Sequence, residues 1–131
     1  MIRARVIAQT LAGLIKQADN IFIMGHKQSD FDSFGASIAM YALCRAYDKK
    51  AYIIINYDSL EEKTAVVAKN LMDDERYRDV FISAGYAHEL VSSGSLLVAV
   101  DNHKPSLAID ENILDIVNNK VVIDHHRRGE E

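Results

Sequence analysis

Hydrophobic and polar positions along this chain change repeatedly between a helical and a strand-like period. Residues 5–18 carry apolar side chains at helical spacing, which predicts one amphipathic helix. Residues 33–47 are apolar nearly all round and contain no proline, as expected of a helix packed between a sheet and another layer. We expect Asp32 or Ser33 to cap that helix. Residues 60–76, rich in charges of both signs, are predicted to be an exposed helix or an irregular helical stretch, and residues 85–91 a short helix.

Short apolar runs, each of the length of a buried strand, separate these helices. They lie at residues 21–24, 51–56, 79–82, 96–100 and 121–123. A helical turn or two is expected within residues 105–118. Strands that alternate with helices indicate right-handed crossovers and a mostly parallel sheet. The sequence therefore predicts one α/β domain over residues 1–131, in three layers, with a five-stranded, mostly parallel sheet and helices on both of its faces.

Histidine and aspartate residues follow several of these predicted strands. In parallel sheets, ligands bind at the carboxyl ends of the strands. The second strand is followed by Asn56-Tyr57-Asp58. The first, fourth and fifth strands are followed by Gly25-His26-Lys27, Asp101-Asn102-His103 and Asp124-His125-His126, respectively. Because three of the five strand ends carry His and Asp near each other, we expect a functional site at this edge of the sheet.

The first cluster is His26-x-x-x-Asp30-x-Asp32, between a strand and a helix. A loop with this spacing can bring one imidazole and two carboxylates around a single point. Such donors suit a divalent ion of intermediate hardness such as Mn²⁺, with Mg²⁺, Fe²⁺, Zn²⁺ and Co²⁺ as competitors. The structural alternative is a polar loop histidine, a turn aspartate and a helix cap.

The second cluster is Asp101, which comes directly after the apolar run 96–100. A carboxylate at the end of a buried strand has lost hydration, so it needs a cation or several hydrogen-bond donors. The alternative is a loop aspartate that accepts hydrogen bonds from backbone N–H groups.

The third cluster is Asp124-His125-His126-Arg127-Arg128. Adjacent histidines at a strand end point in different directions, so one can bind a metal while the other faces a substrate. Asp124 can orient one imidazole by accepting a hydrogen bond from its N–H group. Arg127 and Arg128 can hold phosphate oxygens with paired hydrogen bonds. The alternative is a solvated basic tail.

Together the clusters place at least two histidines and three aspartates at one rim, which is more than one ion needs. Such a set suggests two divalent ions about 3.5–4 Å apart and bridged by a carboxylate, the arrangement that cleaves phosphate esters by in-line attack. The helix that starts near Ser33 would add the positive end of its dipole beside the phosphate.

Composition narrows the classes of function. The 131 residues are 49% hydrophobic, with six Gly and one Pro, which excludes a disordered or linker-dominated chain. A net charge of −4 argues against a basic face for duplex nucleic acid. No apolar run approaches the roughly 20 residues of a membrane span. The single cysteine, Cys44, is expected to serve packing and points to a reducing compartment. We therefore expect a cytoplasmic domain with a small-molecule partner.

These motifs, taken in order, resemble those of the DHH phosphoesterase family. The stretches MGHKQSDFDSFGASIAM, VAVDNHKPS and VVIDHHRRGEE are most similar to its membrane-anchored cyclic-di-AMP phosphodiesterases, in which sensory and degenerate GGDEF domains precede the DHH domain. The resemblance covers about residues 5–131. It implies an Mn²⁺-dependent enzyme that hydrolyses a cyclic dinucleotide to the linear dinucleotide. The full-length parent would be a homodimer anchored in the cell membrane.

The resemblance also assigns roles to single residues. His26, Asp30 and Asp101 would hold one Mn²⁺, and Asp32, Asp101 and His125 would hold the second, with Asp101 as the bridge. Asp124 would orient a metal-binding imidazole. His126 would be catalytic, stabilising charge as the leaving oxygen departs, and His103 would also face the phosphate. Asn102 stands where this branch often has Thr, a departure that touches no expected ligand.

One departure from the family pattern concerns the C-terminal side. In the family, a further Asp well downstream of the DHH triplet completes the second metal site, and a separate C-terminal domain grips the substrate. Because the chain ends at Glu131, we expect residues 1–131 to be the N-terminal catalytic part of a longer protein and poorly active alone. The same ligand set also serves short-RNA or single-strand nucleases and pyrophosphatases. A metal- or nucleotide-binding regulatory module without turnover is the alternative from another class.

Overall fold

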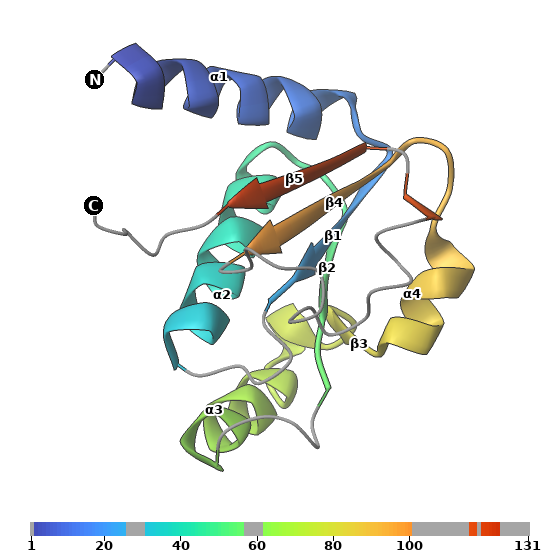
Figure 1. Cartoon of the computed structure of the whole chain (residues 1–131). Helices are drawn as coiled ribbons and strands as arrows, with labels where there is room; N and C mark the ends of the chain where they lie inside the picture. Colours follow the sequence, from blue (N-terminus) through green and yellow to red (C-terminus); the bar gives the residue numbers. More distant parts are fainter. Residues whose placement is uncertain (1, 26–30, 57–61, 101–115, 118, 124–131) are drawn as a thin grey trace.

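The computed structural model describes residues 2–25, 31–56, 62–100, 116–117 and 119–123. Helices and strands alternate along these ranges (Figure 1). The helices are α1 (Ile2–Gln17), α2 (Phe31–Ala46), α3 (Glu62–Met72), the short 3-10 helix η2 (Glu75–Tyr77) and α4 (Ala84–Leu90). The strands are β1 (Asn20–Met24), β2 (Ala51–Ile54), β3 (Phe81–Ile82), β4 (Ser95–Val100) and β5 (Asn119–Ile123).

The five strands form one sheet in the order β3-β2-β1-β4-β5, and every neighbouring pair is parallel. The predicted five-stranded parallel α/β fold is therefore confirmed. The amino ends of β1 and β4 are joined by the side chains of Ser95 and Asn20, because the Ser95 hydroxyl donates to Asn20 Oδ1 over 2.6 Å. This hydrogen bond favours the register in which Asn20 lies beside Ser95 and Ile21 beside Leu96.

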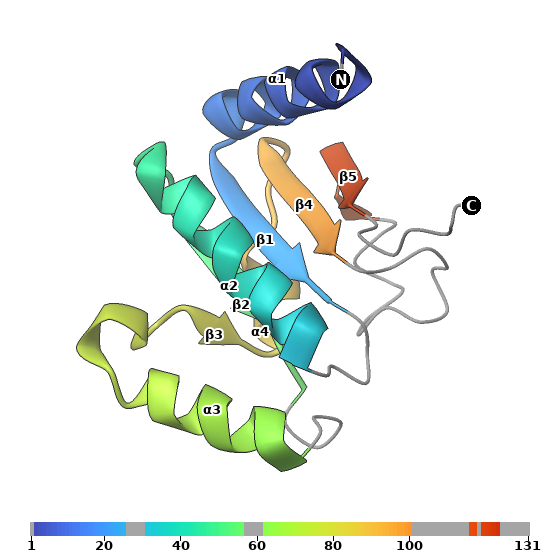
Figure 2. The same ribbon diagram turned by 90° about the vertical axis from the view of Figure 1, so that its left-hand side faces the viewer.

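Alternate residues of each strand pack on opposite faces of the sheet, which gives the three layers. On β1, Ile21 and Ile23 join the core on the side of α2, whereas Phe22 and Met24 join the core that includes Ala87 of α4. Figures 1 and 2 show the sheet between α2 and α4, with α1 near the end at which the strands begin. Helices therefore cover both faces of the sheet, as the sequence predicts.

The central strands read as continuous apolar runs because both of their faces are covered. All six residues of β4 are buried, and so are the last four residues of β1. Phe22 also stacks on Tyr52 of β2, with ring centroids 5.5 Å apart. The middle of the sheet is therefore well packed up to its carboxyl edge, where the histidine and aspartate motifs follow in the sequence.

Several predicted boundaries are wrong by a few residues. Helix α2 begins at Phe31, so Asp32 and Ser33 lie in its first turn and not at the cap position. The next turn of α2 is held by tertiary packing, because Phe34 stacks on Phe81 of β3 with centroids 5.8 Å apart. Strand β2 ends at Ile54 and β3 spans two residues, both shorter than predicted.

The charged stretch 60–76, predicted as an exposed helix or an irregular helical stretch, contains two separate helices. Helix α3 ends at Met72, and η2 begins at Glu75 because the Asp74 carboxylate accepts the Arg76 backbone N–H and so caps the new turn. The predicted exposure of α3 is confirmed only for its outer face, since Thr64 and Ala68 are buried. The turn expected within 105–118 lies outside the described residues, apart from residues 116–117.

Candidate metal centre

Strands β1, β4 and β5 end together at one edge of the sheet. Met24, the last residue of β1, lies beside Ala99 of β4, and Val100 lies beside Ile123, the last residue of β5. Because neighbouring strands are about 4.8 Å apart, the three ends fall within about 10 Å across the sheet. Each of the three histidine and aspartate motifs follows one of these ends in the sequence.

This edge borders the most deeply buried part of the molecule. Met24 has no exposed surface, and Val100 is 2% exposed. Gly25 is also buried, and it is the residue that precedes the first motif. A carboxylate that follows such a strand gains little hydration, so its charge needs a cation or hydrogen-bond donors nearby. The burial of β4 therefore supports the expectation that the carboxylate of Asp101 needs a cation or several hydrogen-bond donors.

The described residues stop short of the predicted ligands themselves. Asp32 belongs to the first turn of α2, and only its backbone is described. The remaining predicted site residues lie outside the described residues: His26, Asp30, Asp101, His103, Asp124, His125, His126, Arg127 and Arg128. Within the part of the chain that is described, no three His, Cys, Asp or Glu side chains gather into a metal-binding group. The ligand assignments thus stay predictions.

Helix α2 starts at the same edge, on the far side of the connection from β1. It runs from Phe31 through two buried positions, Phe34 and Ser37, that anchor it on the sheet. A helix of 16 residues presents unpaired backbone N–H groups and the positive end of its dipole at its first turn. The expected contribution of this dipole to a bound phosphate stays a prediction.

Among the described residues, the ionisable groups with shifted pKa values include Cys44 and Asp74, and both shifts have structural explanations. Cys44 is fully buried in the core between α2 and the sheet, which confirms its expected role in packing, and this burial raises the pKa of its thiol to about 11. Hydrogen bonds from Arg76 lower the pKa of Asp74 to about 2. The acidic turn that contains Asp74 is therefore a helix cap with an arginine partner.

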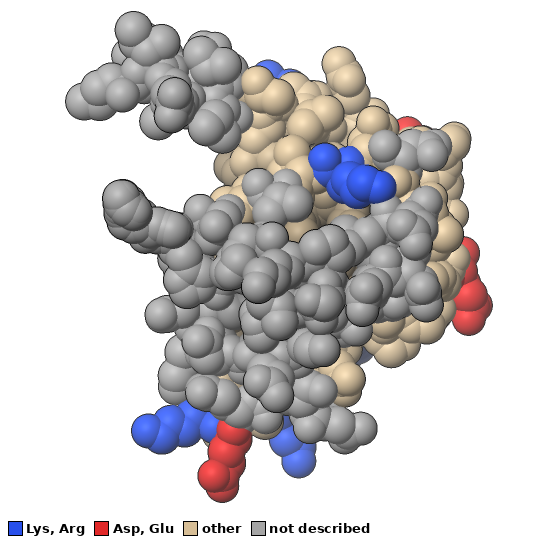
Figure 3. Space-filling model, in the orientation of Figure 1, with Lys and Arg blue, Asp and Glu red and all other residues tan. Residues whose placement is uncertain are grey.

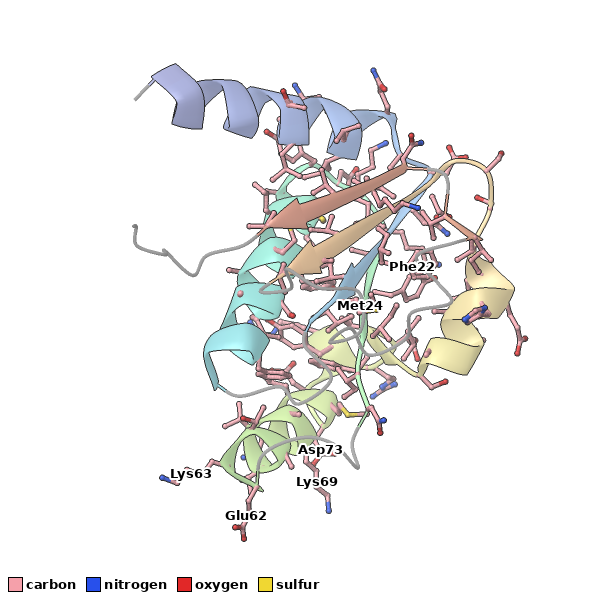
Figure 4. The ribbon with its side chains drawn as sticks, viewed as in Figure 1. Phe22, Met24, Glu62, Lys63, Lys69 and Asp73 are labelled. Carbon is pink, nitrogen blue, oxygen red and sulfur yellow. The ribbon has the colours of Figure 1, made fainter. Side chains whose placement is uncertain are left out.

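The outer surface of α3 carries charges of both signs. Glu62, Lys63 and Lys69 are exposed and project away from the sheet (Figure 4), and Asp73 just beyond the helix is also exposed. Charges of both signs are visible at this end of the molecule (Figure 3). A mixed surface of this kind produces no strong potential of one sign. We therefore assign no role in attracting an anionic substrate to this end of the molecule.

The structure also brings together residues that sequence reasoning missed. Asn56, Met72 and Ser83 line one depression at the carboxyl ends of β2 and β3. In the sequence, Asn56 stands only at the end of a predicted strand, and no local pattern links it to Met72 or Ser83. The one available signal was Ser83, which stands at the end of the third predicted strand and before a helix.

Within the described residues, no helix is long and apolar enough to cross a membrane.

Sequence comparison identifies the family to which this fold and these motifs belong. The profile of the DHH family, N-terminal domain, matches residues 20–131. That range runs from the start of β1 through every predicted ligand. The chain therefore belongs to the DHH family of phosphoesterases, whose members are typically metal-dependent enzymes.

Two curated relatives narrow this relationship. The chain is 40% identical over 134 residues to cyclic-di-AMP phosphodiesterase PdeA of Listeria monocytogenes serotype 1/2a (strain 10403S). It is 38% identical over 130 residues to cyclic-di-AMP phosphodiesterase GdpP of Bacillus subtilis (strain 168). Each match covers 99% of this chain and 20% of the relative, so the chain spans about a fifth of their length. It is a DHH-family phosphoesterase related to cyclic-di-AMP phosphodiesterases.

A solved structure supports the fold independently. The exopolyphosphatase-related protein from Bacteroides fragilis superimposes with a TM-score of 0.66 over 92% of this chain and 34% of its own, at 19% sequence identity. At that identity the likeness concerns the fold alone.

Proposed function

We propose that this domain hydrolyses a phosphodiester bond of a cyclic dinucleotide at a site built on the carboxyl edge of β1, β4 and β5. The observation that carries the proposal is the common end of these strands, at Met24, Val100 and Ile123, each followed in sequence by a motif of histidine and aspartate. Imidazole and carboxylate donors fit divalent ions such as Mn²⁺. The buried strand ends fit a site from which bulk water is largely excluded.

We assign the ligands by motif. His26, Asp30 and Asp101 hold one ion, whereas Asp32 and His125 hold a second, with Asp101 shared between them. When bound, the two ions supply Lewis-acid activation of water and of the phosphodiester. Asp124 accepts a hydrogen bond from a metal-binding imidazole and so fixes its orientation.

The remaining residues of the motifs act on the substrate. His126 stabilises the charge that develops on the leaving oxygen, and it is the catalytic histidine of this proposal. Arg127 and Arg128 bind phosphate oxygens through paired hydrogen bonds, and His103 contributes a further donor to the same phosphate.

The substrate class follows from the relatives that are named cyclic-di-AMP phosphodiesterases. We propose cyclic-di-AMP as the substrate and the linear dinucleotide as the product, because identity to those relatives extends over 99% of this chain. We place the domain in the cytoplasm, as part of a longer, homodimeric protein anchored in the membrane. A net charge of −4 supports a small nucleotide over duplex nucleic acid as the partner.

The test compares three substrates in the presence and absence of Mn²⁺. Release of linear dinucleotide from cyclic-di-AMP is measured beside hydrolysis of a short oligonucleotide and of pyrophosphate, with a chain extended past Glu131. We expect Mn²⁺-dependent turnover of cyclic-di-AMP to exceed the other two. Faster cleavage of the oligonucleotide or of pyrophosphate would instead indicate a nuclease or a pyrophosphatase. Metal binding without turnover of any of the three would indicate a regulatory module.

A matched pair of variants ties the activity to the proposed site. Asp101→Asn removes the bridging carboxylate and is expected to abolish turnover. Asp73→Asn makes the same chemical change at an exposed position beyond α3, and its activity should equal that of the parent chain (Figure 4). Equal activity of both variants would contradict the assignment of Asp101.

A further inference from the structure

The carboxyl edge carries a second feature, a depression at the ends of β2 and β3. Its volume is about 470 Å³, and it is bounded by these two strand ends, the last residue of α3 and the start of α4. The residues that line it include Ile55, Asn56, Met72, Phe81, Ile82 and Ser83. None of them belongs to the histidine and aspartate motifs, so the proposed metal chemistry leaves this depression unused.

Its position relates it to the proposed metal centre. Strand β2 pairs with β1 on the side opposite β4, and Met24 at the end of β1 lies beside Ile54 of β2. The midpoint between β2 and β3 is one and a half strand spacings from β1, or about 7 Å across the sheet. It is about 12 Å from β4 by the same reasoning. These distances are on the scale of one nucleotide, measured from its phosphate to its base.

The inner walls are apolar. Ile55, Phe81 and Ile82 are each less than a tenth exposed, so the floor of the depression is made of aliphatic and aromatic carbon. Met72, at the end of α3, is half-buried and provides a polarisable thioether that packs well on an aromatic ring. None of the described residues that line the depression is charged, so its chemistry suits a neutral ring better than a phosphate.

Among the described residues that line the depression, Asn56 and Ser83 carry exposed polar side chains. Ser83 Oγ accepts the Tyr86 backbone N–H over 3.1 Å, which positions the hydroxyl at the start of α4 and leaves its own proton to donate. Asn56 carries both an amide donor and a carbonyl acceptor. Apolar walls with a few placed polar groups are the usual composition of a small-molecule site.

We propose that this depression binds a nucleobase of the substrate, with the ring against its apolar floor and with Asn56 and Ser83 at its polar rim. The inference rests on the proposed function for the class of substrate, a nucleotide, and adds a base-binding subsite to it. The phosphate at the ends of β1 and β4 and the base between β2 and β3 would then be held by separate parts of one sheet edge.

Methionine methyl groups provide the test in the 131-residue chain itself. The ε-methyl groups are labelled with ¹³C and followed by NMR during titration with AMP or with ribose 5-phosphate, which has the same phosphate and sugar but no base. Met72 lines the depression, whereas Met24 is fully buried in β1 and Met40 lies on α2 and does not line the depression. We expect AMP to shift the Met72 signal while ribose 5-phosphate does not, and the Met40 signal to stay unchanged with both.

A matched pair of asparagine variants tests the polar contact. Asn56→Ala should weaken AMP binding about tenfold, the size expected for loss of hydrogen bonds to one ligand edge. Asn70→Ala makes the same change at an exposed position of α3 that does not line the depression, and AMP affinity should remain within about twofold of the parent. Unchanged Met24 and Met40 signals in each variant show that the fold is retained.

The outcomes separate this inference from the proposed function. A Met72 signal that ignores AMP, or that responds equally to ribose 5-phosphate, overturns the base subsite. Mn²⁺ titration by calorimetry reports on the metal centre independently. If Mn²⁺ binds but the Met72 methyl signal does not respond to AMP, the metal centre is retained and the base subsite is rejected. A Met72 response to AMP without any Mn²⁺ binding supports the subsite and counts against the proposed chemistry.

Discussion

Met24 of β1 and Ala99 of β4 are register partners, one residue before the buried strand β4 ends at Val100. The two strands are separated by about 70 residues in the chain, yet they are adjacent in the sheet. A crossover of this length brings the first motif, which follows β1, to the same edge as the second motif, which follows β4. The pairing of β1 with β4 is thus the structural reason for treating the two motifs as one site.

A bridging carboxylate should matter to both metal ions at once. We predict that Asp101→Asn abolishes binding of both ions, because each would lose negative charge and the repulsion between the two ions would be less well screened. Calorimetric titration with Mn²⁺ measures the number of sites and their affinities. The Asp73→Asn variant is the control and should bind like the parent chain. Two near-normal sites in Asp101→Asn would show that this residue is not the bridge.

The adjacent residues His125 and His126 are predicted to have different roles, His125 in metal binding and His126 in catalysis. In a chain extended past Glu131, His126→Ala should reduce turnover by about 100-fold, the usual size of an acid–base or charge-stabilising contribution, with little change in Mn²⁺ affinity. His125→Ala should weaken the second Mn²⁺ by at least about tenfold, because an imidazole ligand is lost. Initial rates at saturating Mn²⁺ and calorimetry distinguish the two effects. If both variants lose metal affinity alike, the division of labour is wrong.

The core on the α4 side of the sheet makes a separate prediction about stability. Leu97 in β4 has no exposed surface, whereas Leu43 of α2 is 37% exposed. Leu97→Ala should lower the free energy of unfolding by about 2–5 kcal/mol, from lost burial and from the cavity left behind. Leu43→Ala should cost less than about 1 kcal/mol. Urea denaturation followed by circular dichroism measures both, and similar costs would contradict the burial of β4.

Cys44 should be chemically inert while the protein is folded. Its side chain is fully buried and burial raises its pKa to about 11, so near neutral pH almost none of it is present as the reactive thiolate. We predict that Ellman's reagent at pH 8 labels the native chain only as fast as it opens, and labels it at once in concentrated urea. Rapid labelling of the native protein would place Cys44 at the surface instead.

The run lengths of apolar residues were enough to predict five strands, because a covered parallel strand such as β4 has no polar face. Strand order was not predictable in the same way, since the runs at β1 and β4 look alike. Their pairing depends on contacts across the chain, among them the Ser95 to Asn20 hydrogen bond. The start of α2 was misplaced for a related reason, because local capping preference cannot account for the packing of Phe34 on Phe81.

The same distinction between local sequence patterns and contacts across the chain applies to the candidate site. Histidine and aspartate motifs at strand ends are local patterns, so the sequence alone predicts where metal ligands would stand. The depression beside them is different, because Asn56, Met72 and Ser83 come from three separate segments. No periodicity joins these residues, and only the placement of α3 and α4 against β2 and β3 brings them together.

The pair formed by Asp74 and Arg76 gives a prediction about acid. Arg76 Nη2 lies 2.8 Å from Asp74 Oδ2, and its hydrogen bonds lower the pKa of Asp74 from 3.8 to about 2. A carboxyl group whose pKa is lowered by folding stabilises the folded state above its unfolded pKa. That contribution is therefore full above about pH 4 and disappears as the pH falls through about 2.

Carboxyl ¹³C NMR of the folded chain measures this titration directly. We expect a midpoint near 2 for Asp74, and in Arg76→Gln a midpoint moved upward towards 3.8, because the charged guanidinium that holds the carboxylate is gone. Arg78→Gln is the matched control, since Arg78 follows η2 at an exposed position and is not among the causes of the Asp74 shift. A parent midpoint already near 3.8 would mean that neither the ion pair nor the backbone cap of Asp74 forms in solution, because hydrogen bonds from both the Arg76 side chain and the Arg76 backbone N–H lower this pKa.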